Sequence, residues 1–358
     1  MKLLALITDG FGAGGGIAQY NRDLMTGLSQ SKHVESLVAL PRFGGAGAPP
    51  LRGFTQLPPA PGRLAWSSHA LRWALQRRFD VIFCGHINAV PLAAALARMT
   101  RAKLWLQTHG FEAWTAPTRL VRRATERAAL VTAVSRFTRA RLLAWADIAP
   151  DRVRVLPNTV AAAYAPRAPR AEIAARYGLA GRKVILTVGR IAKTERYKGH
   201  DRIIAALPVV VAGCPETLYL VVGSGADRPR LEELARSLGV ADRVVFAGQV
   251  PADELPDHFA LADVFAMPST GEGFGIVFLE AARCGLPVIG GNRDGSSDAL
   301  ADGAIGRLID PFDPSALAGA LIDVLQRPRA AAALGAGVHR FAFDNFASHI
   351  DDLVDSLS

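Results

Sequence analysis

The chain has 358 residues, a length that exceeds the usual range of one domain. Half of the residues are hydrophobic. Its formal net charge of +9 is unevenly spread, because residues 1–165 carry +13 and residues 166–358 carry −4. A basic first half suits an anionic partner, either nucleic acid or an anionic membrane. No helix-turn-helix, zinc-finger or RNA-binding signature is present, so we expect no nucleic-acid partner.

The cysteines Cys84, Cys214 and Cys284 have no metal-ligand spacing and form no even disulfide set, which favours a reducing cytoplasm. The N-terminal MKLLALITDG has too short an apolar run for a signal peptide and is typical of a first buried strand. No segment reaches about 18 uninterrupted apolar residues. We therefore expect a cytoplasmic protein, with the inner face of the cytoplasmic membrane as a candidate peripheral location.

Short apolar runs alternate with helical stretches along both halves. The first half contains LLALIT, VESLVAL, VIFCG, KLWLQTHG, LVTAVS and VRVLPN, and the second contains KVILTVGR, TLYLVVG, RVVFAG, DVFAMPS, PVIGG and IGRLID. Buried strands separated by helices predict parallel sheets. The expected fold is α/β, with two Rossmann-like, doubly wound domains.

The expected domains are residues 1–165 and 183–335. Residues 166–182 are rich in proline, alanine and charge without a strand pattern, and this composition predicts a linker. Residues 336–358 predict a C-terminal helical segment, with the first domain as a candidate packing partner.

Ligands of doubly wound sheets bind at the carboxyl ends of the strands. After the first strand, FGAGGG contains Gly15 and Gly16, whose backbone N–H groups can face a phosphate or carboxylate, although a turn alone would also explain them. His109 follows the strand KLWLQT directly and precedes a glycine. That position makes it a candidate catalytic residue, against the more common structural role of a lone histidine.

Two cations follow the strand KVILTV. Arg190 leaves the strand end, and Lys198 comes just before Gly199 and a helix. Cations next to a helix N-terminus predict a diphosphate site, with solvated loop charges as the alternative.

The stretch EGFGIVFLE places Glu272 in a glycine loop and Glu280 inside the helix that follows. The helix dipole favours an acid at Glu272 whether or not it has a function. Glu280 is harder to explain, because a carboxylate among apolar side chains is costly unless it is paired or binds something polar. Cations for phosphates and carboxylates for hydroxyls predict a nucleotide-sugar site. Asp9 and Asp294 either line such a site or cap turns.

Several motifs together resemble one family. They are GGGIAQ, THG, VSRFTRARL, LPN, GRIAKTERYKG and the Glu-x7-Glu segment. In order and spacing the chain is similar to GT-B glycosyltransferases of the large retaining group 1 (family 4) type, which includes phosphatidylinositol mannosyltransferases and bacterial exopolysaccharide and lipopolysaccharide glycosyltransferases. The resemblance covers essentially the whole chain and implies two domains facing each other across a cleft, with the donor bound by the second.

The resemblance also implies roles for single residues. Arg190 and Lys198 would hold the donor diphosphate, and Glu280 would accept hydrogen bonds from the ribose. Glu272 would hold the transferred sugar, and His109 would face it, so these two are the expected catalytic residues. The other implied binding groups are Gly15 and Gly16 for donor phosphates or acceptor, and the backbone N–H groups of Gly273, Phe274, Gly275 and Ile276 for the sugar.

The expected activity is a retaining transfer of a hexosyl unit, from GDP-mannose or a UDP-hexose to a glycan or lipid-linked acceptor, in cell-surface polysaccharide biosynthesis. Retention is implied by the resemblance. No Asp-x-Asp occurs, so we expect protein cations to replace a metal, and no cofactor. The alternatives are a GT-B-fold sugar-nucleotide epimerase and a non-catalytic sugar-nucleotide binding protein.

The basic half also offers a candidate membrane surface. PGRLAWSSHALRWALQRRFD predicts an amphipathic helix with leucines on one side, tryptophans beside them and arginines among the polar positions. These residues are Leu64, Leu71 and Leu75, Trp66 and Trp73, and Arg72, Arg77 and Arg78. Such a surface can dock on anionic lipid, and a solvated helix face is the alternative.

Overall fold

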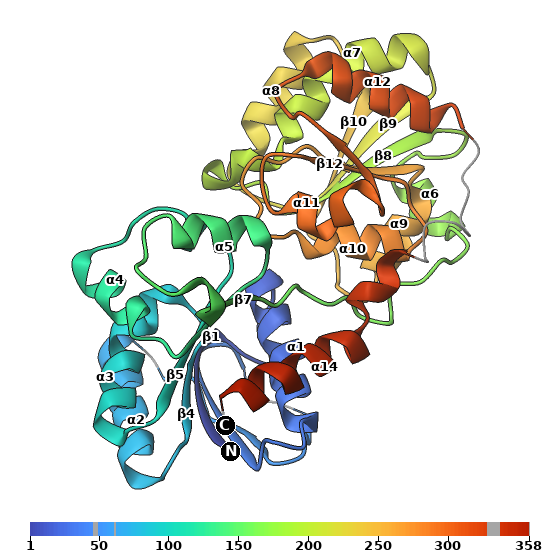
Figure 1. Ribbon diagram of the computed structural model, residues 1–358. Helices are drawn as coiled ribbons and strands as arrows, with labels where there is room; N and C mark the ends of the chain where they lie inside the picture. The colour runs from blue at the N-terminus through green and yellow to red at the C-terminus, as the bar shows by residue number, and fades with distance from the viewer. Residues whose placement is uncertain (46–48, 61, 328–336, 358) are drawn as a thin grey trace. The chain divides into compact units, whose positions relative to one another are not determined.

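The computed structural model describes residues 1–45, 49–60, 62–327 and 337–357. The chain divides into two compact units (Figure 1): unit 1 is Met1–Thr159 with Phe341–Ser358, and unit 2 is Val160–Arg340. The C-terminal segment thus belongs to unit 1. Residues 166–182, where we expected a linker, include helix α6 (Ala171–Arg176) and count with unit 2. The boundary expected at residue 335 lies outside the described residues.

Unit 1 contains a parallel sheet of seven strands in the order β3-β2-β1-β4-β5-β6-β7. The strands are β1 (Lys2–Asp9), β2 (Ser36–Phe43), β3 (Phe54–Gln56), β4 (Val81–Cys84), β5 (Lys103–Thr108), β6 (Leu130–Ala133) and β7 (Val153–Val155). Six of them are the predicted runs. The seventh, β3, is an edge strand of three residues, too short to produce a recognisable hydrophobic pattern.

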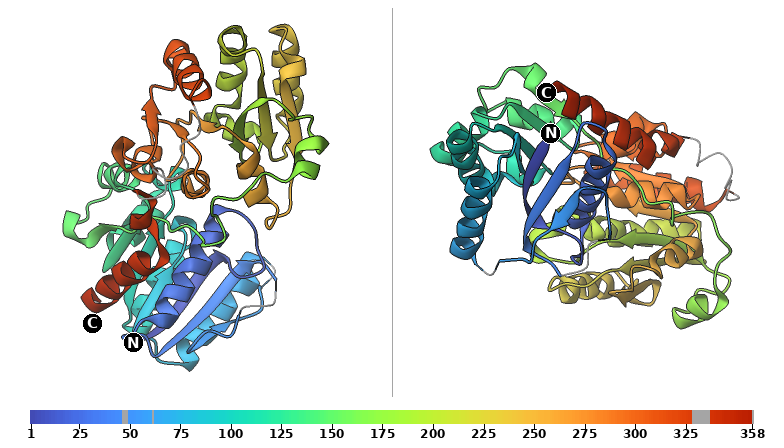
Figure 2. Two further views of the ribbon diagram at one scale, coloured as in Figure 1. Left: turned by 90° about the vertical axis from the view of Figure 1, so that its right-hand side faces the viewer. Right: turned by 90° about the horizontal axis from the view of Figure 1, so that it is seen from below.

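Helices cover both faces of this sheet, as a parallel sheet requires. They are α1 (Gly16–Gln30), α2 (Arg63–Gln76), α3 (Val90–Thr100), α4 (Arg119–Glu126), α5 (Arg136–Leu143) and α14 (Phe343–Ser356). The C-terminal α14 packs against α1 (Figure 2). A Cβ atom at Gly27 would lie 2.4 Å from Ile350 Cδ1, so the glycine allows the two helices to approach closely.

Unit 2 contains a parallel sheet of six strands in the order β10-β9-β8-β11-β12-β13. The strands are β8 (Lys183–Val188), β9 (Thr217–Val222), β10 (Val244–Gly248), β11 (Val264–Met267), β12 (Val288–Gly291) and β13 (Arg307–Ile309). Besides α6, its helices are α7 (His200–Gly213), α8 (Arg228–Ser237), α9 (Leu255–Leu261), α10 (Ile276–Arg283), α11 (Ser296–Ala299) and α12 (Pro314–Leu325). All six predicted strands are confirmed.

Both sheets have the Rossmann strand order, so the predicted α/β fold of two doubly wound domains is confirmed. The strand order reverses next to β1 in unit 1 and next to β8 in unit 2. Ligands of such sheets bind outside the carboxyl ends of the strands at this reversal. The loops that follow β1, β8 and β11 are therefore where ligand-binding residues are expected.

A chain of buried polar groups runs through the core of unit 2, starting at the N-terminus of α7. His200 Nδ1 lies 3.2 Å from the hydroxyl of Tyr219, which donates to Thr187 Oγ1 at 2.9 Å, and Thr187 donates to Ala266 O at 2.6 Å. Because the Tyr219 hydroxyl donates its proton to Thr187, His200 Nδ1 donates to the Tyr219 oxygen. Burial, together with the nearby charge of Lys198, lowers the pKa of His200 to about 4.

We predict that His200 stays neutral until the pH falls to about 4. An unfolded histidine protonates near pH 6.5, so the unfolded state binds this proton first as the pH falls. The contribution of neutral His200 to stability is complete above about pH 6.5 and decreases between that pH and the folded pKa. The measurement is NMR of the folded protein with ¹³C-labelled histidine, in which the His200 signal is identified by its loss in His200→Gln. Titration of that signal near pH 6.5 would contradict the prediction.

Candidate functional site

Helix α10 (Ile276–Arg283) follows the glycine loop, as the sequence predicted. Gly275, just before it, has φ 87°, and a Cβ atom there would lie 2.6 Å from Phe278 Cδ2. Glycine is therefore required for the loop to enter the helix at this angle. Glu272 lies in this loop and Glu280 lies on the helix, so the two acids occupy the predicted elements.

Lys198 and Glu272 form a buried ion pair. Lys198 Nζ donates to Glu272 Oε1, and each side chain is only 13% exposed. Lys198 ends the short helix Lys193–Lys198 after β8, whereas Glu272 belongs to the loop after β11. Burial alone would lower the pKa of Lys198, but Glu272, Tyr197 and Glu195 together outweigh burial and the pKa is raised. Lys198 is therefore a charged ammonium at neutral pH.

Glu195 connects Lys198 to the second predicted cation. It forms an ion pair with Arg190, and its Oε2 atom lies 4.0 Å from Lys198 Nζ. Glu195 is 11% exposed and Arg190 is 79% exposed, so the arginine reaches from a buried acid toward solvent. Sequence analysis missed Glu195. Its position between the two cations, in the segment RIAKTERYK, was the signal available.

Glu280 is half-buried and faces a tyrosine hydroxyl. Burial raises the pKa of Tyr164, and the carboxylate of Glu280, which accepts a hydrogen bond from that hydroxyl, raises it further. The Tyr164 ring packs edge-on against the buried Phe259, with 5.9 Å between ring centroids. The carboxylate of Glu280 thus has a hydroxyl partner within unit 2.

The four predicted backbone donors lie in the loop that enters α10 and at its first residue. Phe274 is buried, and Gly273, Gly275 and Ile276 are half-buried. This is the positive end of the helix dipole, where an anion or an electron-rich oxygen is favoured.

His109 in unit 1 lies directly after β5 and is held by neighbouring groups. Its Nε2 atom lies 2.9 Å from the carbonyl oxygen of Gly85, and its backbone N–H donates to Glu112 Oε1 at 2.6 Å. The imidazole ring packs edge-on against the ring of Tyr20, with 5.1 Å between ring centroids. Burial lowers the pKa of His109. A neutral imidazole that donates from Nε2 has an unprotonated Nδ1, which can accept a hydrogen bond.

Gly15 and Gly16 lie at the N-terminus of α1, which begins at Gly16. Both are exposed, and a Cβ atom at either would meet nothing within 4 Å. Gly15 has φ 98°, a backbone conformation that favours glycine. The structure therefore places these two glycines and His109 in unit 1, and the other predicted site residues in unit 2.

The predicted amphipathic helix is α2, but one part of its expected surface is wrong. Trp66 is 7% exposed, and its indole N–H donates to Leu40 O at 3.2 Å, so it belongs to the core of unit 1. Leu64, Leu71 and Leu75 are 89%, 38% and 58% exposed. Trp73 is half-buried and packs against the same core, so the leucines are the apolar groups that α2 leaves most exposed.

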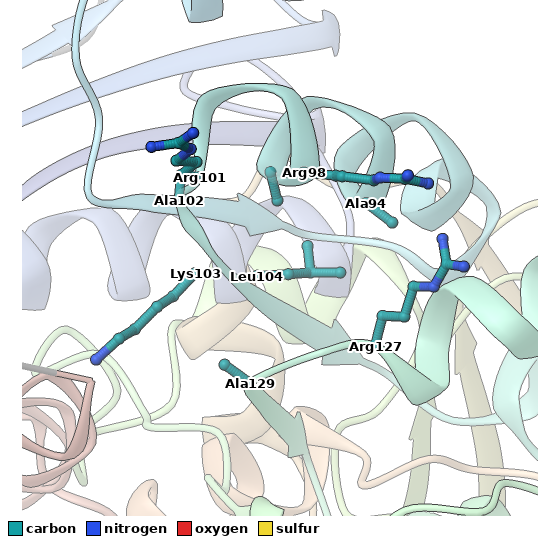
Figure 3. Close-up of a pocket in the computed structure, with 9 residues that line it drawn as sticks. Ala94, Arg98, Arg101, Ala102, Lys103, Leu104, Arg127 and Ala129 are labelled. Carbon is teal, nitrogen blue, oxygen red and sulfur yellow. The ribbon is translucent and has the colours of Figure 1, made fainter.

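A basic cavity of about 640 Å³ lies at the ends of α3 and α4 and the start of β5 (Figure 3). Its charged lining consists of Arg98, Arg101, Lys103 and Arg127, and Lys103 also donates to Leu357 O at 2.7 Å. None of the predicted site residues lines it. In the described part of the chain, no three His, Cys, Asp or Glu side chains are grouped as metal ligands would be.

Two family models match the chain. The model described as "Glycosyl transferases group 1" matches residues 169–339, and "Glycosyltransferase Family 4" matches residues 14–164. A relative from Mycolicibacterium smegmatis, named GDP-mannose-dependent alpha-(1-6)-phosphatidylinositol monomannoside mannosyltransferase, is 36% identical over 280 residues, which is 75% of this chain and 72% of the relative. D-inositol 3-phosphate glycosyltransferase of Acidothermus cellulolyticus is 38% identical over 55% of this chain and 46% of its own length.

Solved structures share the fold over the full length. Anabaena HepE in complex with UDP has a TM-score of 0.78 at 21% identity and covers 99% of this chain and 100% of its own. Sucrose-phosphate synthase of Thermosynechococcus elongatus has a TM-score of 0.77 at 24% identity, with coverage of 100% and 99%. The fold is therefore GT-B. With the family models and the mycobacterial relative, it follows that the chain is a glycosyltransferase and belongs to group 1 of these enzymes.

Proposed function

We propose that this glycosyltransferase transfers a hexosyl unit from a nucleotide-diphosphate sugar to a glycan or lipid-linked acceptor, with retention and without a metal ion. The proposal rests on the buried ion pair of Lys198 and Glu272, which lies where the strand order of the second sheet reverses. Lys198 is a cation suited to phosphate, and Glu272 is a carboxylate suited to sugar hydroxyls. Arg190 supplies the second cation through its pairing with Glu195.

The proposed step breaks the bond between the anomeric carbon and the diphosphate oxygen and forms a bond from the same carbon to the acceptor oxygen. The acceptor proton passes to the leaving diphosphate. Lys198 and Arg190 stabilise the negative charge of the departing group, so the sugar can develop oxocarbenium character. Glu272 and the N–H groups before α10 hold the sugar hydroxyls. Retention follows the family resemblance.

Two further roles belong to the proposal. Glu280 accepts hydrogen bonds from the ribose hydroxyls. This role is compatible with the hydrogen bond that it already accepts from the hydroxyl of Tyr164. His109 acts on the reacting sugar, and its unprotonated Nδ1 is suited to accept from a sugar hydroxyl.

GDP-mannose is the first candidate donor, because the mycobacterial relative is named for it, and a UDP-hexose is the alternative. The same name identifies that relative's acceptor as a mannosylated phosphatidylinositol, which supports a lipid-linked acceptor here. Cell-surface polysaccharide biosynthesis is the proposed setting.

The exposed surface of α2 supports peripheral binding to an anionic membrane at the inner face of the cytoplasmic membrane. Its leucine stripe is accompanied by the exposed Arg72 of the helix, whereas Arg77 and Arg78, which were predicted to continue the helix, follow its last residue, Gln76, and are exposed as well. The arginines attract anionic lipid, and the leucines can insert between headgroups. No helix in the described residues is long and apolar enough to cross a bilayer.

We predict different effects for the three charged donor-site residues. Lys198→Ala and Glu280→Ala should weaken binding of the donor nucleotide by about 10- to 100-fold, as expected for the loss of hydrogen bonds to charged groups. Glu272→Gln should lower kcat by about 100-fold, the size of effect seen when a group that stabilises the transition state is removed. Nucleotide affinity should be unchanged or higher in Glu272→Gln, since Lys198 loses its internal counter-ion. Calorimetric titration and transfer kinetics measure the two effects.

The matched control is Lys193→Ala, because Lys193 is an exposed lysine on the same short helix as Lys198. It should leave affinity and turnover unchanged. Wild-type nucleotide affinity in correctly folded Lys198→Ala would contradict the proposed diphosphate site.

We predict that the protein co-sediments with anionic vesicles more than with zwitterionic ones. Each arginine near such a surface contributes about 1 kcal/mol, which salt weakens within a Debye length of about 8 Å. Changing Arg72, Arg77 and Arg78 together to Ser should move the protein from pellet to supernatant without altering nucleotide affinity. Some binding should survive moderate salt because of the leucines.

The control for vesicle binding is an equal loss of charge elsewhere. Arg182, Arg236 and Arg293 are exposed arginines of unit 2, and changing them together to Ser should leave vesicle binding intact. If both triple variants are released from vesicles equally, only net charge matters and α2 is not the binding surface. If the wild-type protein does not prefer anionic vesicles, a soluble acceptor is favoured.

A further inference from the structure

Asp294, in the loop after β12, accepts hydrogen bonds from residues of two loops. Its Oδ2 atom accepts from the backbone N–H of Glu272 at 2.7 Å and from Ser269 Oγ at 2.8 Å. Its Oδ1 atom accepts from the backbone N–H of Ser296 at 2.9 Å. The residue is only 1% exposed. Asp294 thus joins its own loop to the loop that carries Glu272.

The backbone of Glu272 is held on both sides by the same loop. Its N–H donates to Asp294, and its carbonyl oxygen accepts from the backbone N–H of Gly295 at 2.9 Å. The two loops are in close contact there, since a Cβ atom at Gly295 would lie 2.0 Å from Gly273 O. The position of the Glu272 main chain is therefore fixed by residues 294 and 295.

Burying the carboxylate of Asp294 to join the two loops is energetically costly. No lysine or arginine in the described residues forms an ion pair with it, so its charge is balanced by hydrogen bonds alone. Burial raises the pKa of Asp294, although these hydrogen bonds oppose the effect. A buried carboxylate without a cation usually destabilises the folded state relative to a neutral side chain of the same shape. The carboxylate offers one acceptor oxygen to each of two backbone N–H groups, those of Glu272 and Ser296, which a neutral amide cannot do.

We propose that Asp294 is a positioning residue, which holds Glu272 where its carboxylate meets both Lys198 and the hydroxyls of the transferred sugar. This inference rests on the proposed sugar-holding role of Glu272. Asp294 acts through the main chain of Glu272 and contacts no substrate. Its loss displaces the carboxylate that acts on the sugar, while Lys198, Arg190 and Glu280 keep their positions. Turnover therefore depends on Asp294 and nucleotide affinity does not.

The test is Asp294→Asn, which keeps the shape of the side chain but replaces one acceptor oxygen with a donor amide. We expect kcat to fall by about 10- to 100-fold, since a displacement of about 1 Å in a catalytic site has an effect of this size. Affinity for GDP or UDP, measured by calorimetry, should change by less than about twofold, and the melting temperature should fall only modestly, since one buried donor loses its acceptor. Ser269→Ala, which removes one donor to Asp294, should show the same pattern with a smaller loss.

Asn292→Ala is the control, because Asn292 is an exposed residue of the same loop. It should match wild type in every measurement. A wild-type kcat in Asp294→Asn would overturn this inference but not the proposed function. A large fall in melting temperature, with equal losses of affinity and turnover, would also overturn it, because that pattern indicates a structural role. A wild-type protein that binds neither GDP nor UDP would instead overturn the proposed function, and this inference with it.

Discussion

The ion pair between Lys198 and Glu272 is the interaction on which the donor site depends. Burying two charges is costly, and their attraction offsets this cost only when the geometry is good and the remaining polar atoms are satisfied. Here Glu195 lies 4.0 Å from the same ammonium and ties it to Arg190. The cations proposed for the diphosphate are therefore balanced by acids of the protein itself. A diphosphate would compete with Glu272 for Lys198, and Glu272 would then be available to sugar hydroxyls.

The fold explains how residues so far apart in sequence form this pair. Because the strand order of unit 2 reverses between β8 and β11, the loops after these neighbouring strands meet at one edge of the sheet. Lys198 comes from the first loop and Glu272 from the second. Gly199, with φ 81°, lets the chain turn directly into α7, where a Cβ atom would lie 2.5 Å from Pro268 O. Close packing of backbone at this edge leaves the charged side chains little freedom.

The sequence predicted the fold well because buried parallel strands appear as continuous apolar runs. It could not predict β3, since three residues at a sheet edge have no period to recognise. Lys198 and Glu272 could be assigned to one site from their places after strands, but their direct pairing depends on tertiary structure. For Asp294 the sequence left two interpretations open, lining the site or capping a turn, and its hydrogen bonds to two loops depend on tertiary structure. Trp66 was misjudged, since helical periodicity does not say which neighbouring stripe faces the core.

We propose that cations of the protein, and not a bound metal, hold the donor diphosphate. Calorimetric titration of the wild-type protein in excess EDTA with GDP, UDP and the corresponding monophosphates tests this proposal directly. We expect one diphosphate to bind at least about tenfold more tightly than its monophosphate, a difference of about 1.4 kcal/mol, and EDTA to leave this ratio unchanged. Diphosphate affinity that disappears in EDTA and returns with magnesium or manganese would contradict it.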